Sequence, residues 1–454
     1  MPKIAVVGAG QAGCLAAHAL HRRGFEVTLY TDKTPDDFLT KARPTGTAAR
    51  FDMALEFERQ LGLERWGEVA PHGEGVHLTF CPTIGNQLVT LLGHMTRDFL
   101  AIDVRLQSAT WIEMLDRSGA KVEVENVTVE RLEEIASRND LTMVAAGGRE
   151  LRDLFPRDEQ RSSYSKPQRY LAMVNVTGIP MRLPYAPWFC PVKFNFYGTA
   201  GEMFWVPWYS KGRQQAWSLV FEGKEGGPID RFREVRTAER CLQTALEVIR
   251  ELAPWDYEWV RGAELCDENA WLVGAFTPEV RKVVGTLPSG RDVMALGDTA
   301  QSLDPIGGQG ANNGNKMARV FVDQIVERGE RPFDRQWMES AMDAFWQRHR
   351  WIEIFNNTLL EPITKAGQLI LIAQYGSTAK PGEMGPRQKI ANRFIDNFND
   401  PSDLTPAFQD AGKAKAVIRE AFGSTFGPLM AGRLAIGRAQ LRQKLGRRPG
   451  HPGT

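Results

Sequence analysis

The 454-residue sequence is poor in the features that mark secreted, metal-binding and membrane-spanning proteins. Its five cysteines are scattered, odd in number and never in C-x-x-C spacing, so neither a metal site nor a disulfide framework is expected. No apolar run approaches the length that crosses a bilayer. Stable membrane insertion is therefore not expected. The formal net charge is only +1, so no overall field would attract nucleic acid or an anionic membrane. Because the first motif begins at residue 3, no signal peptide is expected, and we predict a cytoplasmic protein.

The sequence also has few of the side-chain arrangements that carry out catalysis directly. It contains only seven histidines, no H-E-x-x-H motif, no Ser-His-Asp arrangement and no evident pair of catalytic acids. These absences agree with chemistry performed by a bound organic cofactor, for which the protein supplies binding, orientation and a dry pocket.

What the sequence does contain is a dinucleotide-binding fingerprint near its beginning. An apolar run leads into G-x-G-x-x-G, a helical pattern covers residues 11–23, and residues 26–31 have the pattern of a second strand. The helix N-terminus would offer partial positive charge to a pyrophosphate, and the acid after the second strand would bind a ribose. The cofactor-binding residues predicted from this part of the chain are Gly8, Gly10, Gln11, Ala12, Gly13, Thr31 and Asp32.

A second glycine-rich element follows a predicted strand over residues 291–296. A carboxylate at the end of that strand can bind sugar-type hydroxyls, and a helix N-terminus can stabilise the anionic edge of a reduced flavin. Together the two elements resemble the paired FAD motifs of flavoprotein monooxygenases built like aromatic hydroxylases, and they indicate FAD rather than NAD. The predicted cofactor-binding residues here are Gly297, Asp298, Pro305, Gly308, Gln309, Gly310, Ala311 and Asn312.

Further segments resemble the oxygenase component of the styrene and indole monooxygenases, which are two-component flavoenzymes. The matching segments keep their order along nearly the whole chain, and two of them are not general FAD motifs: Lys166-Pro167-Gln168-Arg169 and Phe394-Ile395-Asp396-Asn397-Phe398-Asn399. By this resemblance, Arg43 and Arg105 stand where family members place arginines close to the flavin. Both are therefore predicted to bind the cofactor.

The resemblance implies an α/β fold. We expect a Rossmann-like FAD-binding domain from residues 1–165 with 275–330, and a mixed or antiparallel β-sheet substrate domain from residues 166–274 with strands near 76–92. A C-terminal helical region is expected over residues 331–454. Within the first domain, residues 35–50 are predicted to form a loop. Aromatic residues crowd the segment 188–217, where they either line a pocket or form the core of the sheet.

The active-site loop departs from the family pattern at one position. Family members carry Arg-x-x-Asn-Thr, whereas this chain reads Arg43-Pro44-Thr45-Gly46-Thr47. Thr47 and Gly46 are therefore the candidate catalytic-loop residues. Because Gly46 replaces a side-chain amide and frees volume, a bulkier or differently placed substrate than styrene is expected.

The resemblance also implies a reaction and its partners. Reduced FAD would come from a separate NAD(P)H-dependent flavin reductase, and O2 would add to it as a C4a-hydroperoxide. One oxygen atom would then pass to an electron-rich C=C bond of a small aromatic, indole- or styrene-like substrate. The helices after residue 333 would cover the FAD domain or a second copy in a homodimer.

Several alternatives stay open at this point. A single-component NAD(P)H-dependent aromatic hydroxylase would also contain only one nucleotide fingerprint. A flavin-dependent halogenase needs W-x-W-x-I-P, which Trp351-Ile352-Glu353-Ile354 does not supply, and a non-catalytic relative would not be expected to keep Asp298 with the following loop. The basic stretch 433–448 is either a solvated terminal helix or a contact surface for a reductase, an acidic surface or lipid.

Overall fold

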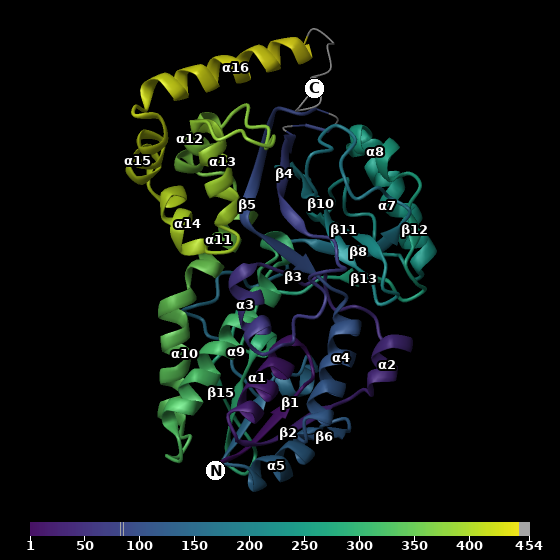
Figure 1. The fold of residues 1–454 in the computed structure, drawn as a ribbon, viewed down its shortest axis with the longest axis vertical. Coiled ribbons are helices and arrows are strands. Elements are labelled where there is room, and N and C mark those ends of the chain that lie inside the picture. The colour runs from purple at the N-terminus through teal and green to yellow at the C-terminus, as the bar shows by residue number, and fades with distance from the viewer. Residues whose placement is uncertain (82, 85, 445–454) are drawn as a thin grey trace. The chain divides into compact units, whose positions relative to one another are not determined.

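The computed structural model describes residues 1–81, 83–84 and 86–444, which divide into two compact units (Figure 1). The first unit comprises Met1–Glu68, Ile102–Gln168 and Phe276–Glu353. The second comprises Val69–Ala101, Arg169–Ala275 and Ile354–Thr454. Each unit is therefore assembled from three segments that are distant in the sequence.

The first unit is built on a six-stranded sheet with the order β15-β16-β7-β1-β2-β6. All neighbouring strands are parallel except β15 and β16. The inner strands consist of apolar residues that are buried almost throughout, as expected for a parallel sheet covered on both faces. The strands are β1 (Lys3–Val7), β2 (Glu26–Thr31), β6 (Lys121–Val124), β7 (Leu141–Val144), β15 (Val284–Thr286) and β16 (Asp292–Ala295).

Helices and short connecting elements complete this unit. The long helix α9 packs against α1, so the helix after the first motif contacts the helix after the second. The helices are α1 (Gln11–Arg22), α2 (Pro35–Thr40), α3 (Asp52–Gln60), α4 (Val104–Arg117), α5 (Val129–Arg138), α6 (Arg149–Arg152), α9 (Gln309–Arg328) and α10 (Arg335–His349). The short elements are β3 (Ala49–Arg50), β14 (Glu279–Val280), η1 (Gly297–Thr299), β17 (Gln301–Ser302) and η2 (Pro305–Gly307).

The prediction of a loop over residues 35–50 is wrong at its beginning, where α2 forms. Thr34 and Asp37 make a capping box: the Thr34 hydroxyl accepts from the Asp37 N–H at 3.0 Å, and the Asp37 carboxylate accepts from the Thr34 N–H at 3.1 Å. Pro35 occupies the first helical position, where its missing N–H costs nothing. These local bonds start a helix despite the turn-like composition.

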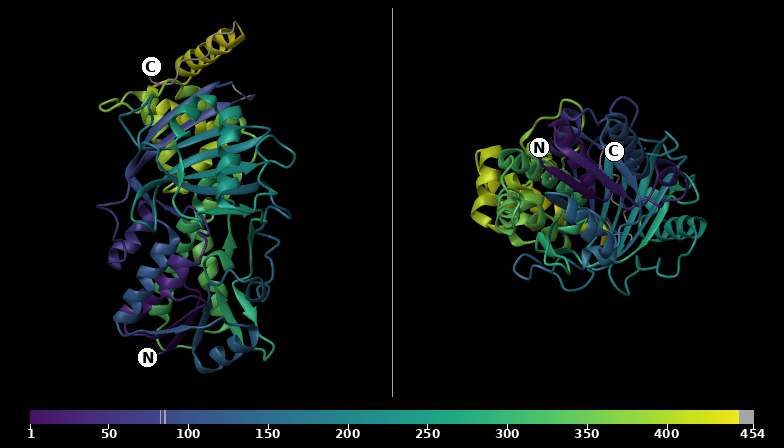
Figure 2. Two further views of the ribbon diagram at one scale, coloured as in Figure 1. Left: turned by 90° about the vertical axis from the view of Figure 1, so that its right-hand side faces the viewer. Right: turned by 90° about the horizontal axis from the view of Figure 1, so that it is seen from below.

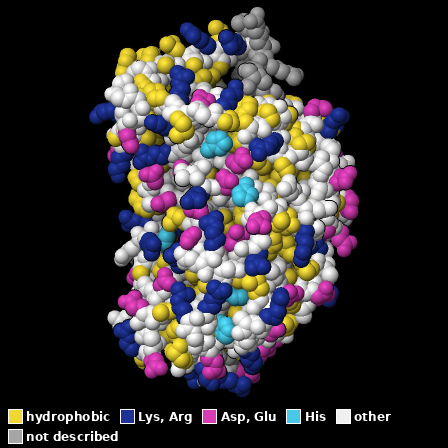
Figure 3. Space-filling model, viewed as in Figure 1, with side chains coloured by type: hydrophobic (Ala, Val, Ile, Leu, Met, Phe, Trp, Pro, Cys, Tyr) yellow, Lys and Arg dark blue, Asp and Glu magenta, His cyan; other side chains and the backbone are white. Residues whose placement is uncertain are grey.

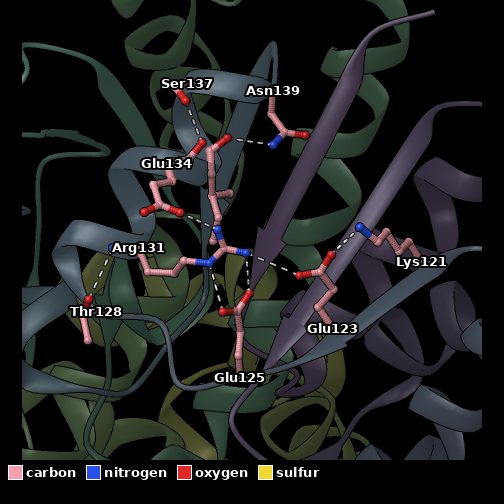
Figure 4. A network of polar contacts seen from close by, with 9 residues as sticks. Lys121, Glu123, Glu125, Thr128, Arg131, Glu134, Ser137 and Asn139 are labelled. Atoms are coloured by element: carbon pink, nitrogen blue, oxygen red, sulfur yellow. Dashed lines mark hydrogen bonds and ion pairs between the residues drawn. The ribbon is translucent and has the colours of Figure 1, made fainter.

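A cluster of charged residues lies where β6, which ends at Val124, leads into α5 (Figure 4). The Arg131 guanidinium donates two hydrogen bonds to the Glu125 carboxylate, both at 2.9 Å, and a third to Glu134 at 2.7 Å. The bonds from Arg131 hold the pKa of Glu125 below its ordinary value. Thr128 caps the helix by accepting from the Arg131 N–H at 3.3 Å.

The second unit is built on a sheet whose strands follow the order β12-β8-β11-β10-β9-β4-β5, with β13 paired to β8. The pairings are antiparallel except that between β4 and β9, so this is a mixed sheet. β5 continues well beyond its predicted end near residue 91. The strands are β4 (Gly73–Cys81), β5 (Val89–Ala101), β8 (Tyr170–Thr177), β9 (Pro191–Tyr197), β10 (Gly201–Tyr209), β11 (Gln215–Gly223), β12 (Glu264–Leu265) and β13 (Trp271–Gly274).

One face of this sheet packs against α7 (Ala238–Leu252) and α8 (Pro254–Val260) (Figure 2). Trp205, Trp217 and Phe221 lie in this core with no solvent exposure. At least this part of the aromatic segment therefore serves as the core of the sheet, where large rings contribute most of the buried apolar area.

The remaining helices of the second unit follow the boundary helix α11 (Trp351–Leu360): α12 (Lys365–Ala373), α13 (Pro386–Asp396), α14 (Pro401–Gln409), α15 (Ala411–Phe422) and α16 (Phe426–Lys444). α13 lies against β5 at Gly93, where an added Cβ would stand 2.7 Å from the Ala391 carbonyl oxygen. α16 holds the first part of the basic stretch; residues 445–448 lie outside the described residues. Within the part of the chain that the structure describes, none of the helices could cross a bilayer.

Candidate active site

The fingerprint turn is shaped by two glycines that admit no side chain. Gly8 has φ +113°, and an added Cβ would stand 2.5 Å from the Ala145 carbonyl oxygen. A Cβ at Gly13 would stand only 2.0 Å from the Gly8 carbonyl oxygen. A Cβ at Gly10, in contrast, would meet no atom within 4 Å. Gly8 and Gly13 are thus required for close packing of the backbone, whereas Gly10 leaves the turn open to a ligand.

The second motif lies directly beside the first. The Leu296 N–H donates to the Val144 carbonyl at 2.8 Å as β16 joins β7. Gly297, at φ +62°, turns the chain so closely past α1 that an added Cβ would lie 3.0 Å from the Ala12 side chain. Two glycine-rich segments from opposite ends of the unit therefore form one continuous surface.

Two helix N-termini on this surface carry no side-chain cap. α1 follows Gly10 and α9 follows Gly308, which has the left-handed φ of +60°. A Cβ at Gly310, in the first turn of α9, would also meet no atom within 4 Å. Uncapped helix N-termini bind anions through their free N–H groups and the helix dipole. This donor set fits the pyrophosphate and the anionic flavin edge of FAD.

The predicted acids differ in their surroundings. The Asp32 side chain is 54% exposed and forms an ion pair with Lys33 at the end of β2. Thr31 is buried, and its hydroxyl donates to the Lys33 carbonyl at 3.1 Å, so it shapes that turn. Asp298 lies in η1, just after β16, and its side chain is exposed to solvent. Partial desolvation by the surrounding protein raises the pKa of its carboxyl above the ordinary value.

The two predicted arginines also differ. Arg105 is almost fully buried, and its guanidinium binds the Asp103 carboxylate through Nε at 2.9 Å and Nη2 at 2.7 Å. Its Nη1 donates to the Ala42 carbonyl at 3.4 Å, so Arg105 holds the loop that precedes Arg43. The Arg43 side chain itself is exposed. Asp103, which also caps α4, is a positioning residue that was not among the predicted cofactor-binding residues.

Gln11 and Gln107 add an amide pair beside the first motif. The Gln11 Nε2 donates to the Gln107 Oε1 at 2.5 Å. The Gln107 Nε2 is buried, and among the described residues it has no hydrogen-bond acceptor. An unsatisfied donor of this kind is rare in protein interiors and is typical of functional sites.

The active-site loop ends in a strained residue held by a buried ion pair. Ala48 has φ +53°, and its carbonyl accepts from the Arg50 Nη1 at 2.7 Å. The Arg50 Nε lies 2.6 Å from the Glu58 carboxylate, and neither side chain is exposed. Glu58 also accepts from the Asn315 amide at 2.8 Å. Sequence reasoning missed Arg50, Glu58 and Asn315, which share no local motif.

Asn312 fixes the other side of the same segment. Its Oδ1 accepts from the Phe51 N–H at 2.8 Å, and its Nδ2 donates to the Ala49 carbonyl at 2.9 Å and to the Gly308 carbonyl at 2.7 Å. Its side chain thus joins the loop to the glycine-rich turn. Gln309 is likewise buried, with its Nε2 donating to the Gly307 carbonyl at 3.0 Å. Upstream of these contacts, a Cβ at Gly46 would meet no atom within 4 Å.

Comparison with known proteins finds relatives along most of the chain. Residues 147–259 match the family model "Styrene monooxygenase A putative substrate binding domain", and residues 3–41 match that of glucose inhibited division protein A. Styrene monooxygenase StyA of Pseudomonas fluorescens is 26% identical over 413 residues, which cover 88% of this chain and 93% of that protein. These matches support the styrene monooxygenase family for this chain. It is a flavin-dependent monooxygenase, and its cofactor is FAD.

Solved structures agree on the fold of this flavin-dependent monooxygenase. A flavoprotein/dehydrogenase from Cytophaga hutchinsonii superposes with a TM-score of 0.59 at 14% identity, covering 90% of this chain and 98% of that one. The flavin-dependent halogenase CmlS gives a TM-score of 0.58 at 14% identity, covering 98% and 77%. The expected Rossmann-type α/β fold with a mixed sheet and a helical C-terminal region is confirmed.

Proposed function

We propose that this monooxygenase is the oxygenase of a two-component system that epoxidises an electron-rich C=C bond. It would receive reduced FAD from a separate NAD(P)H-dependent flavin reductase. Reduced FAD supplies two electrons and two protons, so that one atom of O2 passes to the substrate and the other leaves as water. The observation that carries this proposal is the match of residues 147–259 to the substrate-domain model of styrene monooxygenase A.

The chain's own residues have binding and positioning roles in this proposal. The N–H groups after Gly10 hold the pyrophosphate, and those after Gly308 face the anionic flavin edge. Asp32 accepts from the adenosine ribose and Asp298 from the flavin sugar chain. Arg43 contributes positive charge from an exposed position, and Arg105 acts mainly by holding the loop through its contact with the Ala42 carbonyl.

The substrate in this proposal is a small aromatic with an electron-rich double bond, either indole-like or styrene-like. Thr47 and Gly46 lie on the loop that faces it. Open space around Gly46 supports a substrate larger than styrene, because no side chain fills the volume that the family asparagine would occupy.

A single-turnover experiment tests the two-component assignment. The protein is loaded anaerobically with reduced FAD, then mixed with O2 and indole or styrene in the absence of NAD(P)H. We expect one equivalent of oxygenated product for each bound flavin, with little H2O2. Flavin oxidation that yields only H2O2, with product formed only when NADPH is supplied to the protein alone, would instead identify a single-component hydroxylase.

Asp298→Ala tests the cofactor site separately. Loss of a hydrogen bond to a charged acceptor costs about 1.5–3 kcal/mol, which corresponds to a rise of about ten- to a hundredfold in the Kd for FAD. Equilibrium titration by flavin fluorescence measures this Kd. Asp292→Ala, at the start of the preceding strand β16, is the matched control and should keep the wild-type Kd. Equal affinity in the wild type and Asp298→Ala would refute the role given to Asp298.

A further inference from the structure

The outward side of α16 carries an apolar stripe that its own unit leaves uncovered. Phe426 is 76% exposed, Met430 40%, Leu434 55% and Leu441 59%. At 3.6 residues per turn, their spacings of four, four and seven residues place all four within a sector of about 80°. Large exposed apolar side chains in one row mark an interaction surface more often than isolated ones do.

The inward side of α16 is already occupied by α12. Gly432 is buried there, and an added Cβ would stand 2.2 Å from the Ile372 carbonyl oxygen. By helix geometry Gly432 lies on the side opposite the stripe. The stripe therefore takes no part in docking α16 onto α12, and its exposure is a property of the folded unit.

Basic residues are concentrated on the same helix. Arg433, Arg438 and Arg442 are exposed, and no ion pair joins them to a carboxylate in the described part of the chain. Arg433 borders one side of the stripe and Arg438 the other. After Glu420 the sequence contains six Lys and Arg residues and no acid, whereas the whole chain has a net charge of only +1. Figure 3 shows dark-blue and yellow side chains along this helix, at the top of the view.

We propose that α16 binds the surface of an anionic lipid bilayer. The apolar stripe would enter the boundary between headgroups and acyl chains, and the flanking guanidiniums would bind lipid phosphates. A row of exposed large side chains with cations on both sides suits a deformable bilayer better than a preformed protein pocket. Such binding is peripheral, and it goes beyond the proposed oxygenase activity without depending on it.

Flotation of the full-length protein with vesicles tests this proposal. Vesicles of equal parts phosphatidylcholine and phosphatidylglycerol should carry the wild-type protein upward, whereas pure phosphatidylcholine vesicles should not. The triple variant R433Q/R438Q/R442Q should bind about a hundredfold more weakly, since each basic residue near an anionic surface contributes about 1 kcal/mol. L434S/L441S should weaken binding at least about tenfold through lost apolar burial.

A matched control separates local charge from total charge. R65Q/R97Q/R291Q removes three exposed arginines elsewhere and should keep wild-type vesicle binding. Near-UV circular dichroism and FAD binding show that each variant is folded. The proposal is overturned if the wild type stays with the unbound fraction, or if the control loses as much binding as the α16 variant. Sedimentation as a dimer that L434S/L441S dissociates, without vesicle binding, would also overturn it and assign the stripe to a second copy.

Discussion

The side-chain oxygen of Asn312 accepts a hydrogen bond of 2.8 Å from the backbone N–H of Phe51, 261 residues away in the sequence. The same side chain donates to the carbonyls of Ala49 and Gly308. The segment after the Gly46 loop and the turn before α9 are therefore held by one residue. Although we predicted Asn312 as a cofactor ligand, these contacts give its side chain a positioning role for the loop.

Replacing Asn312 with Ala should loosen the loop more than it damages the rest of the unit. Two buried backbone groups lose their partners, at a cost of about 1–3 kcal/mol each, so the free energy of unfolding should fall by about 3 kcal/mol. Hydrogen exchange at the Phe51 amide should accelerate to near the rate of an exposed loop. Asn313→Ala, which removes a bond to Gln301 instead, should leave that amide protected. A protected Phe51 amide in the Asn312 variant would contradict this role.

The fingerprint glycines should respond in opposite ways to Ala. Gly13→Ala places a Cβ 2.0 Å from the Gly8 carbonyl oxygen, so the protein without FAD should lose about 1–3 kcal/mol of stability. Gly10→Ala meets open space, so its apo stability should match the wild type while FAD affinity falls. Thermal unfolding with and without FAD distinguishes the two. The role of Gly10 would be wrong if its variant gained the full wild-type increase in Tm on addition of FAD.

Gly46→Asn tests whether this position controls substrate choice. Gly46 does not have a left-handed φ and an added Cβ has room, so the variant should fold normally. The added amide fills volume that a larger indole would need, so the ratio of the rate with styrene to the rate with larger indoles should rise. Each methylene-sized group that no longer fits costs about 1.4 kcal/mol, which corresponds to about a tenfold change in this ratio. Competition between the two substrates in one reaction measures the ratio directly. An unchanged ratio would show that the pocket is formed elsewhere.

The free energy of unfolding at low pH should depend on the contacts of Arg131 with Glu125 and Glu134. Since Arg131 lowers the pKa of Glu125 in the folded state, the stabilisation is present above the ordinary glutamate value of about 4.5 and is lost as the pH falls through the lowered value. Arg131→Met should therefore cost about 1 kcal/mol at neutral pH, allowing for partial exposure. The difference in the free energy of unfolding between this variant and the wild type should become smaller below about pH 4.5. Urea unfolding across pH measures it, with Arg117→Met as an exposed control that should show no such trend.

Local sequence rules predicted the elements that depend on local chemistry. The strand, turn and helix around Gly8–Gly13 and the strand over residues 26–31 follow from apolar periodicity and glycine placement, and their bounds agree closely with the structure. α2 was missed because its capping box is hidden among turn-forming residues. β5 was cut short because polar residues such as His94, Thr96 and Asp98 interrupt the apolar pattern.

Contacts between residues that are far apart in the sequence could not be predicted from local sequence patterns. Arg50 and Glu58 are buried as a pair, although isolated charged residues in a sequence are usually taken as surface. Asn312 bonds to backbone atoms, which carry no sequence identity at all. The positions of the glycine motifs could therefore be predicted. Arg105 and Asn312 were predicted as site residues, but their contacts with the loop, and the buried pair of Arg50 and Glu58, could not be predicted.

The place of β16 in the sheet has a consequence for how the protein is made. β7 pairs with β16 on one side, yet residues 292–295 leave the ribosome only after β4, β5 and β8–β13, the strands described for the second unit. Until then the edge of β7 has no partner, and unpaired edges invite association with other chains. The nascent protein must wait for α9 before both halves of the cofactor cradle exist. Flavin capture is therefore a late event in biosynthesis, and fragments ending before α9 should be prone to aggregation and unable to retain FAD.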